Sequence, residues 1–221
     1  MRRIFLVLLL MVFGVAQAEA GRTEIRLNIP KLSQGSNRQQ LVYLRMITDN
    51  RTFEDRPNEA STPSIAEGGV ASTTPEERRF YIARVRDGYG KARNNIFLDP
   101  KQPVEQVVRE LLTACLSAQG YRVIGEPGQA GDNILIMDVV IDQLWGFIVV
   151  KGGGWAGDTP KMAGSIKTVL NVTGADGAKG RYEVSGEALH KFMLMTSGHW
   201  VKMFEELFDD YRKNLERVKL P

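Results

Sequence analysis

The chain has 221 residues, of which 43% are hydrophobic and 25% are charged, and its formal net charge at pH 7 is +3. Residues 1–18 contain two arginines and no acid, so the net charge of the remainder falls to +1. This near-neutral balance gives no reason to expect a nucleic-acid partner, and the apolar content is sufficient for a core. The length suits one domain with a long insertion, or one large and one vestigial domain.

The N-terminal stretch has the three-part layout of a secretory signal peptide. Residues 1–3 (MRR) are basic, residues 4–15 form an apolar run, and a small-x-small motif (AQA) ends at Ala18. A membrane anchor would need about 20 apolar residues, which is longer than this run. We therefore expect cleavage after Ala18 or Ala20 and export, most simply to the periplasm.

The sequence contains one cysteine, Cys115. A bacterial lipoprotein carries its lipid on a cysteine just after the signal, and none stands there. Cys115 instead falls on the apolar face of a predicted helix, where a lone cysteine usually behaves as a small buried hydrophobe. We expect no intramolecular disulfide and no stable membrane anchor once the signal is removed.

The first half of the mature chain alternates strand-like segments with polar connections. Four strands are predicted from alternating or β-rich sequence, at residues 24–29, 41–47, 80–85 and 96–98. Between the second and third, residues 54–77 are rich in Pro, Gly, Ser and Thr and poor in large apolar side chains. We interpret this segment as a flexible insertion, with a partner-binding loop as an alternative, because such a composition buries too little surface to offset its ordering entropy.

Two amphipathic helices are predicted, at residues 103–119 and 197–218, from apolar side chains spaced i, i+3, i+4, i+7. Their apolar positions are Val104, Val107, Val108, Leu111, Leu112, Cys115 and Leu116 in the first helix, and Trp200, Val201, Phe204, Leu207, Phe208, Tyr211 and Leu215 in the second. Gly120 ends the first helix and Ser197 is the expected cap of the second.

The second half supplies the remaining strands. A short strand follows the first helix at residues 121–124, and a long apolar strand begins at residue 134. In that strand Leu135, Met137, Val139, Ile141 and Trp145 are expected to share one face, and Ile136, Asp138, Val140, Asp142 and Leu144 the other. Two more strands, 162–173 and 181–195, flank the turn residues Ala-Asp-Gly at 175–177, a hairpin signal. The fold predicted is α/β (α+β): one mostly antiparallel sheet of five to seven strands with both helices on one face.

The sequence predicts no catalytic residue, no metal ligand and no cofactor-binding residue. Its two histidines, His190 and His199, accompany neither a G-x-S-x-G motif nor an H-E-x-x-H motif. Asp138 and Asp142 share a strand face about 13 Å apart, too far for two carboxylates to act on one bond. We expect each aspartate to be exposed at an edge or paired with a Lys or Arg.

Two loops are candidates for partner contact. Residues 152–155 (GGGW) place Trp155 on a flexible loop, and aromatic side chains of this kind are frequent in binding surfaces. Arg86 and Tyr89 lie in a second glycine-containing turn with basic neighbours, which could meet anionic envelope material or simply face solvent. We predict Trp155, Tyr89 and Arg86 as contact residues.

Three segments in order resemble the YajG-like family of Gram-negative envelope proteins, mostly lipoproteins. They are ITDNR at 47–51, VRDGYG at 85–90 and AQGYRVI at 118–124, and the resemblance covers residues 26–140. It implies an exported α/β domain without established enzymatic activity. The chain departs from that family in lacking the lipobox cysteine and in carrying the 54–77 insertion.

Three functions remain open from the sequence. The first is a non-enzymatic periplasmic accessory or binding protein that contacts an envelope protein. The second is a small periplasmic hydrolase that uses His199 or Asp138 and Asp142 beside Trp155. The third is a protein that binds a small ligand between sheet and helices.

Overall fold

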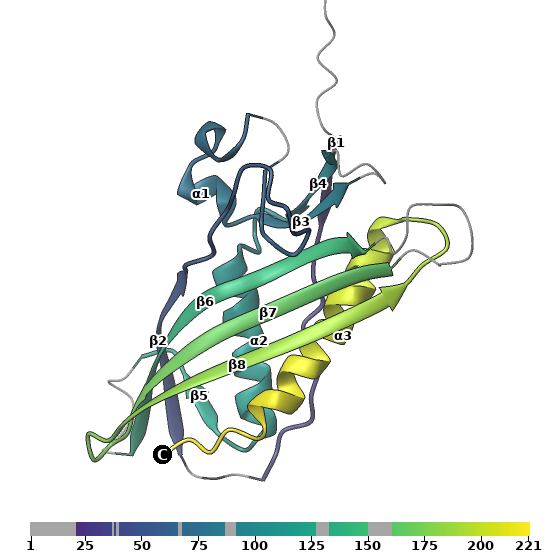
Figure 1. The fold of residues 1–221 in the computed structure, drawn as a ribbon. Helices are drawn as coiled ribbons and strands as arrows, with labels where there is room; N and C mark the ends of the chain where they lie inside the picture. Colours follow the sequence, from purple (N-terminus) through teal and green to yellow (C-terminus); the bar gives the residue numbers. More distant parts are fainter. Residues whose placement is uncertain are drawn as a thin grey trace, which may run out of the picture.

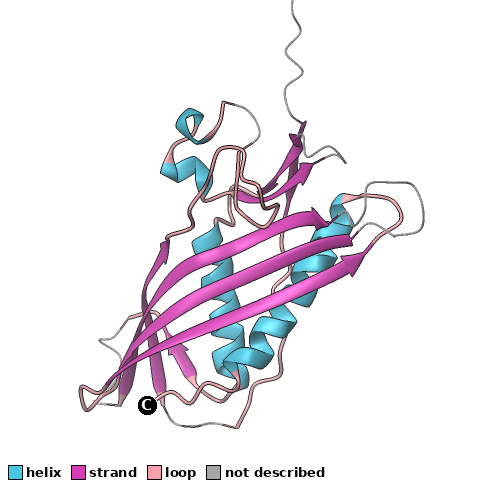
Figure 2. Ribbon diagram, viewed as in Figure 1, coloured by secondary structure: helices cyan, strands magenta, loops and turns pink. Residues whose placement is uncertain are grey.

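The structure is a computed structural model that describes residues 21–36, 38, 40–65, 68–86, 92–126, 133–149 and 161–221. Within these residues the chain forms one eight-stranded sheet, and two long helices pack against it (Figure 1 and Figure 2). The elements in chain order are β1 (Gly21–Ile25), β2 (Leu41–Asp49), the 3-10 helix η1 (Val70–Ser72), α1 (Pro75–Arg78), β3 (Tyr81–Arg86), β4 (Ala92–Leu98), α2 (Val104–Ala118), β5 (Arg122–Ile124), β6 (Ile134–Val149), β7 (Lys161–Thr173), β8 (Lys179–Lys191) and α3 (Ser197–Leu215).

Both predicted helices are confirmed. All seven apolar positions predicted for α2 are buried, and the chain leaves the helix at Gly120, whose φ of 92° favours glycine. In α3 the buried face contains Met203 and not Val201, while the other six predicted positions are buried. The residue preceding α3 is Thr196, so Ser197 is not the N-cap but the first helical residue.

The α/β class is confirmed, and the sheet combines an antiparallel and a parallel part. The antiparallel part is the larger: β6, β7 and β8 form a meander in which both ladders run the full length of β7, and β3 pairs with β4. The pairs β1–β4, β2–β5, β2–β6 and β3–β6 are parallel. Strand β6 therefore has β7 along one edge and shares its other edge between β2 and β3.

The prediction that Trp145 shares a face with Leu135 and Ile141 is wrong. The register between β6 and β7 shifts between Ile141 and Gln143, so one extra residue interrupts the alternation of side chains. As a result Leu144 lies in the core beneath the helices, and Trp145 points to the opposite face of the sheet.

Three glycines let α3 approach the sheet closely. A Cβ at Gly146 would meet Trp200, one at Gly164 would meet Met203, and one at Gly186 would lie 2.7 Å from the backbone nitrogen of Tyr211. The space between sheet and helices is filled at these three points by the side chains and backbone of α3. This packing gives no support to the hypothesis of a small ligand between the two layers.

Residues 54–65, here called the strap, cross the face of the sheet opposite the long helices. Although the composition of the insertion suggested that it would bury little, Pro57, Pro63, Ser64 and Ile65 are buried. The sheet binds the strap through polar side chains: Trp145 Nε1 donates to the Ala60 carbonyl at 3.3 Å, and Gln143 Nε2 donates to the Ser61 carbonyl at 2.8 Å. These hydrogen bonds satisfy backbone carbonyls of the strap and add to its few buried apolar side chains.

Candidate functional site

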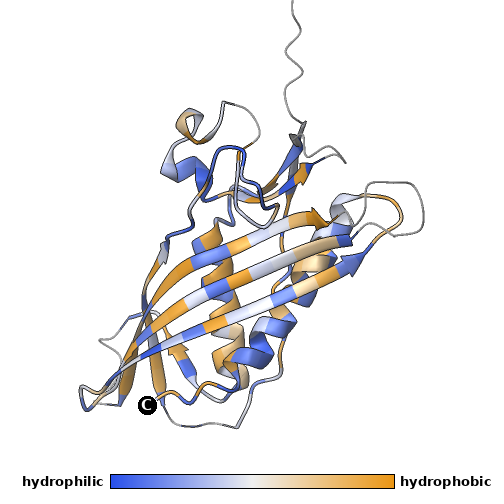
Figure 3. Ribbon diagram, in the orientation of Figure 1, coloured by the Kyte–Doolittle hydropathy of each residue, from blue (hydrophilic) through white to orange (hydrophobic). Residues whose placement is uncertain are grey.

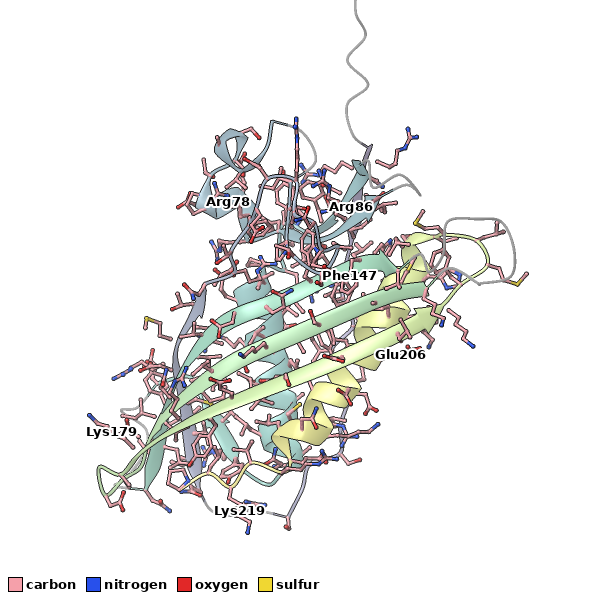
Figure 4. All side chains as sticks on the ribbon, viewed as in Figure 1. Arg78, Arg86, Phe147, Lys179, Glu206 and Lys219 are labelled. Carbon is pink, nitrogen blue, oxygen red and sulfur yellow. The ribbon has the colours of Figure 1, made fainter. Side chains whose placement is uncertain are left out.

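One of the three predicted contact residues belongs to the described part of the chain. Arg86 is the last residue of β3 and is half-buried. Trp155 and Tyr89 lie outside the described residues. Figure 4 shows Arg86 at the end of the molecule opposite Lys179, which begins β8.

Arg86 forms a cluster with Arg84 and Ser64 that we call the arginine corner. Arg84 Nη1 donates to Ser64 Oγ at 2.8 Å, and Arg86 Nη2 donates to the same oxygen at 3.3 Å. Arg86 Nη1 also donates to the Pro57 carbonyl at 3.0 Å. Both guanidinium groups thus meet at one strap hydroxyl, which holds the strap against β3.

The acceptors of the arginine corner are neutral. No carboxylate among the described residues pairs with Arg84 or Arg86, and Arg84 Nε is buried without a hydrogen-bond partner. Burial, together with the neighbouring Arg86 charge, lowers the pKa of Arg84 to about 10, and burial also lowers the pKa of Arg86. Among the described residues the corner is thus a pair of positive charges without a carboxylate partner, of which Arg86 is the more accessible.

A second surface lies where β8 ends and α3 begins. Large apolar side chains are exposed there: Leu189 is 56%, Met193 92%, Leu194 77% and Met195 49% exposed. We call these four residues the apolar tip, and Figure 3 shows the connection between β8 and α3 as a hydrophobic stretch at the edge of the molecule. A shallow hollow of about 420 Å³ adjoins it, lined by Lys191, Phe192, Met193, Leu194 and His199.

The two histidines lie together beside the apolar tip. His190 Nδ1 is 2.9 Å from Glu206 Oε1, and His190 Nε2 is 3.1 Å from His199 Nδ1. This chain of polar contacts connects the end of β8 to the N-terminal half of α3, as expected for histidines with a structural role. No group of three or more His, Cys, Asp or Glu side chains that could hold a metal occurs within the described ranges.

The residues of the hydrolase hypothesis are not brought together. In the sheet register Asp138 is opposite Asn171 of β7, whereas His190, which contacts His199, is opposite Met162. These positions are separated by about 30 Å along β7. Asp138 forms a bidentate ion pair with Arg45, confirming the expected pairing with a basic residue, and this pairing lowers the pKa of the Asp138 carboxyl.

Sequence reasoning missed Ser64 and the apolar tip. Ser64 is one of several serines in a polar segment, and nothing local indicates that it meets Arg84 across the fold. The tip did leave a signal, the run Met193–Leu194–Met195 outside any amphipathic period, but we assigned it to the predicted strand 181–195. Because β8 ends at Lys191, these side chains are on a connection and not in the sheet.

In the part of the chain that the structure covers, no helix is both long and apolar enough to span a membrane. No protein family model matches the sequence, and no curated protein matches it. The YajG-like resemblance therefore stays a prediction.

Solved structures with a similar path of the chain were found at low sequence identity. One is an uncharacterized protein, 14% identical, with 89% of this chain and 97% of that chain covered and a TM-score of 0.49. A Xanthomonas campestris protein of the family DUF330 is 12% identical over 89% of this chain and 93% of that chain, with a TM-score of 0.44. A protein described as a neuraminyllactose-binding hemagglutinin homolog from Helicobacter pylori is 12% identical over 87% of this chain and 91% of that chain, with a TM-score of 0.37.

Proposed function

We propose that this chain is a non-enzymatic accessory or binding protein of the bacterial cell envelope. It is exported to the periplasm after cleavage at Ala18 or Ala20, and it acts through contacts with another envelope protein. The signal-like N-terminus and the separation of Asp138 from His199 support this proposal. A hydrolase is the less favoured function because those groups do not share a site.

The arginine corner is the observation that carries the proposal. Charged guanidinium groups form their strongest bonds with carboxylates, yet Arg84 and Arg86 bond to neutral oxygens of the strap. An acidic segment of a partner protein would supply the missing negative charge at Arg86, while Arg84 behind it strengthens the positive field. The partner we propose is therefore a protein with an exposed run of Asp or Glu.

Binding of a fluorescently labelled Asp/Glu-rich peptide, measured by polarisation, tests this function. We expect Arg86→Gln to weaken binding about 10-fold or more, because a hydrogen bond to a charged group contributes about 1.5–3 kcal/mol. The matched control is Arg181→Gln, which removes the same charge from an arginine whose side chain is 64% exposed on β8. Equal loss in both variants, or no binding by the wild type, would contradict the proposal.

Export is tested separately, by mass spectrometry of the protein recovered from a periplasmic fraction. The expected product begins at Glu19 or Gly21. Gly21 is also the first residue of β1, so cleavage at either position leaves every described element intact. Recovery of the unprocessed chain with the membranes would show that the N-terminal segment is retained as an anchor.

A further inference from the structure

The apolar tip has the chemistry of a surface that meets lipid. Met193 and Leu194 project from a connection at the end of the sheet, with exposed fractions of 92% and 77%. Such side chains lose contact with water when they enter the boundary between lipid headgroups and acyl chains, and burial of this kind stabilises peripheral membrane binding. The adjoining hollow is shallow, and Met193 and Leu194 form part of its lining, so it does not enclose a small ligand.

The segment that carries the apolar tip contains no carboxylate, and a carboxylate beside it, Glu206, contacts His190. Residues 188–204 contain no Asp or Glu, and of their two lysines Lys202 pairs with Glu205 at 3.3 Å, which leaves Lys191. Lys191 lies directly opposite Lys161 in the β7–β8 ladder. Like charges opposite one another destabilise a sheet, and no carboxylate among the described residues pairs with either lysine. An anionic surface would compensate both charges.

The start of α3 adds a further positive element. The first turn of α3 contains no acidic residue, and Thr196 makes no side-chain hydrogen bond to cap it. The backbone N–H groups there keep the partial positive charge of a helix N-terminus, which favours anions such as phosphate. The helix thus begins beside the exposed apolar side chains with its positive end uncompensated.

We propose that the apolar tip docks on the surface of an anionic lipid bilayer. Met193, Leu194 and Met195 enter the interfacial layer, while Lys161, Lys191 and the N-terminus of α3 face the headgroup phosphates. The contact is peripheral and reversible. It is independent of the arginine corner, which lies on β3 under the strap and binds protein in the function proposed above.

Co-sedimentation with lipid vesicles tests this inference, using the chain from Gly21 onward, which contains every described element. We expect binding to vesicles of phosphatidylcholine and phosphatidylglycerol, and much weaker binding to phosphatidylcholine alone. Met193→Glu combined with Leu194→Glu should abolish binding to the anionic vesicles. Lys161→Gln and Lys191→Gln should each weaken it about five-fold, because a lysine near an anionic surface contributes about 1 kcal/mol.

The control is Met46→Glu, which places one of these charges on a methionine that is 56% exposed on β2, away from the apolar tip. This variant should bind vesicles like the wild type. Thermal melting of the tip variant should match that of the wild type, because the replaced side chains are exposed.

Three results would overturn the inference: no binding of the wild type to anionic vesicles, equal binding to neutral vesicles, or full binding by the tip variant. Analytical ultracentrifugation tests whether a second copy of the chain covers the tip instead. A wild-type dimer that becomes monomeric in the tip variant would show that the tip is a self-association surface. The acidic-peptide assay at Arg86 is run on the same variants. A failure of lipid binding is thereby distinguished from a failure of the proposed function.

Discussion

At the scale of single residues, Arg51 connects more of the fold than any pattern in the sequence indicates. Its side chain is fully buried and forms a bidentate ion pair with Asp49. It also donates to the carbonyl oxygens of Tyr81, Leu144 and Arg78 at 2.7, 3.0 and 3.0 Å. One guanidinium thus connects the end of β2 to α1, β3 and β6.

Replacing Arg51 with Met should destabilise the protein by about 3–5 kcal/mol, because it leaves Asp49 and three carbonyl groups without their donor. Urea unfolding followed by circular dichroism measures the change. Arg45→Met is the control: Arg45 also pairs with an aspartate, but its side chain is 55% exposed. Loss of the Arg45 side chain should lower the free energy of unfolding by about 1 kcal/mol or less. A similar decrease in both variants would contradict the role assigned to Arg51.

Cys115 should be unreactive in the folded protein. Burial raises the pKa of its thiol from 9.0 to about 12, so the nucleophilic thiolate is scarce below that pH. Because the folded pKa is the higher, the stability contributed by the neutral thiol is complete below pH 9 and decreases as the pH rises toward 12. Labelling with a disulfide reagent at pH 8 should require urea, and rapid labelling without urea would refute the buried assignment.

At the scale of elements, the sequence predicted the features that periodicity determines and missed those that depend on distant contacts. The face of α2 was predicted residue by residue, because the spacing of apolar side chains determines which of them meet the sheet. The bulge in β6 and the burial of the strap left no local signal. Both depend on partners far along the chain, such as Lys167 opposite Gln143 and Trp145 against Ala60.

The strap should open more readily than the core. Gln143→Ala removes the donor to the Ser61 carbonyl, a bond with a net contribution of about 1 kcal/mol. Hydrogen exchange of residues 57–65 should accelerate about five-fold, while that of α2 stays unchanged. Gln106→Ala, on the half-buried surface of α2, should leave strap exchange as it is. Equal exchange of the strap in wild type and Gln143→Ala would show that this bond does not hold it.

The close approach of α3 to β8 makes Gly186 difficult to replace. A Cβ there would lie 2.7 Å from the Tyr211 backbone nitrogen, so Gly186→Ala must displace the helix. We expect a loss of about 1–3 kcal/mol in urea unfolding, the usual cost of overpacking. Gly125→Ala is the control, since nothing lies within 4 Å of the added carbon. If Gly186→Ala left the free energy of unfolding unchanged, α3 would be able to shift away from the added carbon without cost.

At the scale of the whole molecule, the α/β class and the two helices on one face could be predicted, whereas the sites were predicted only in part. Arg86 was selected as a contact residue because of its basic turn, and the structure places it in the arginine corner. Its relation to Ser64 required the path of the strap. The order of strands, in which β6 separates β2 and β3 from β7, also has no counterpart in local sequence.

The edge of the sheet that β8 forms is protected by α3. Within the described residues β8 pairs only with β7, and on its other side Asp210 accepts from the Glu187 backbone N–H while Asn214 donates to the Ser185 carbonyl. Exposed strand edges promote association between molecules. The double variant Asp210→Ala with Asn214→Ala should therefore aggregate faster in light scattering at elevated temperature than wild type. Lys202→Ala, also on α3, should aggregate at the wild-type rate. If the double variant also aggregates at the wild-type rate, the edge is protected by other means.

The position of β6 between the two parts of the sheet also has a consequence for the order of folding. Strands β2 and β3 pair with β6 in the sheet, so the chain must close long loops before either finds that partner. The β6–β7–β8 meander and α3, in contrast, form from contacts that are near in sequence and should assemble early. Since a chain emerges N-terminus first during synthesis, β2 cannot pair with β6 until residues 134–149 have been synthesised. We therefore expect the C-terminal half to form first and to serve as the template for the N-terminal half.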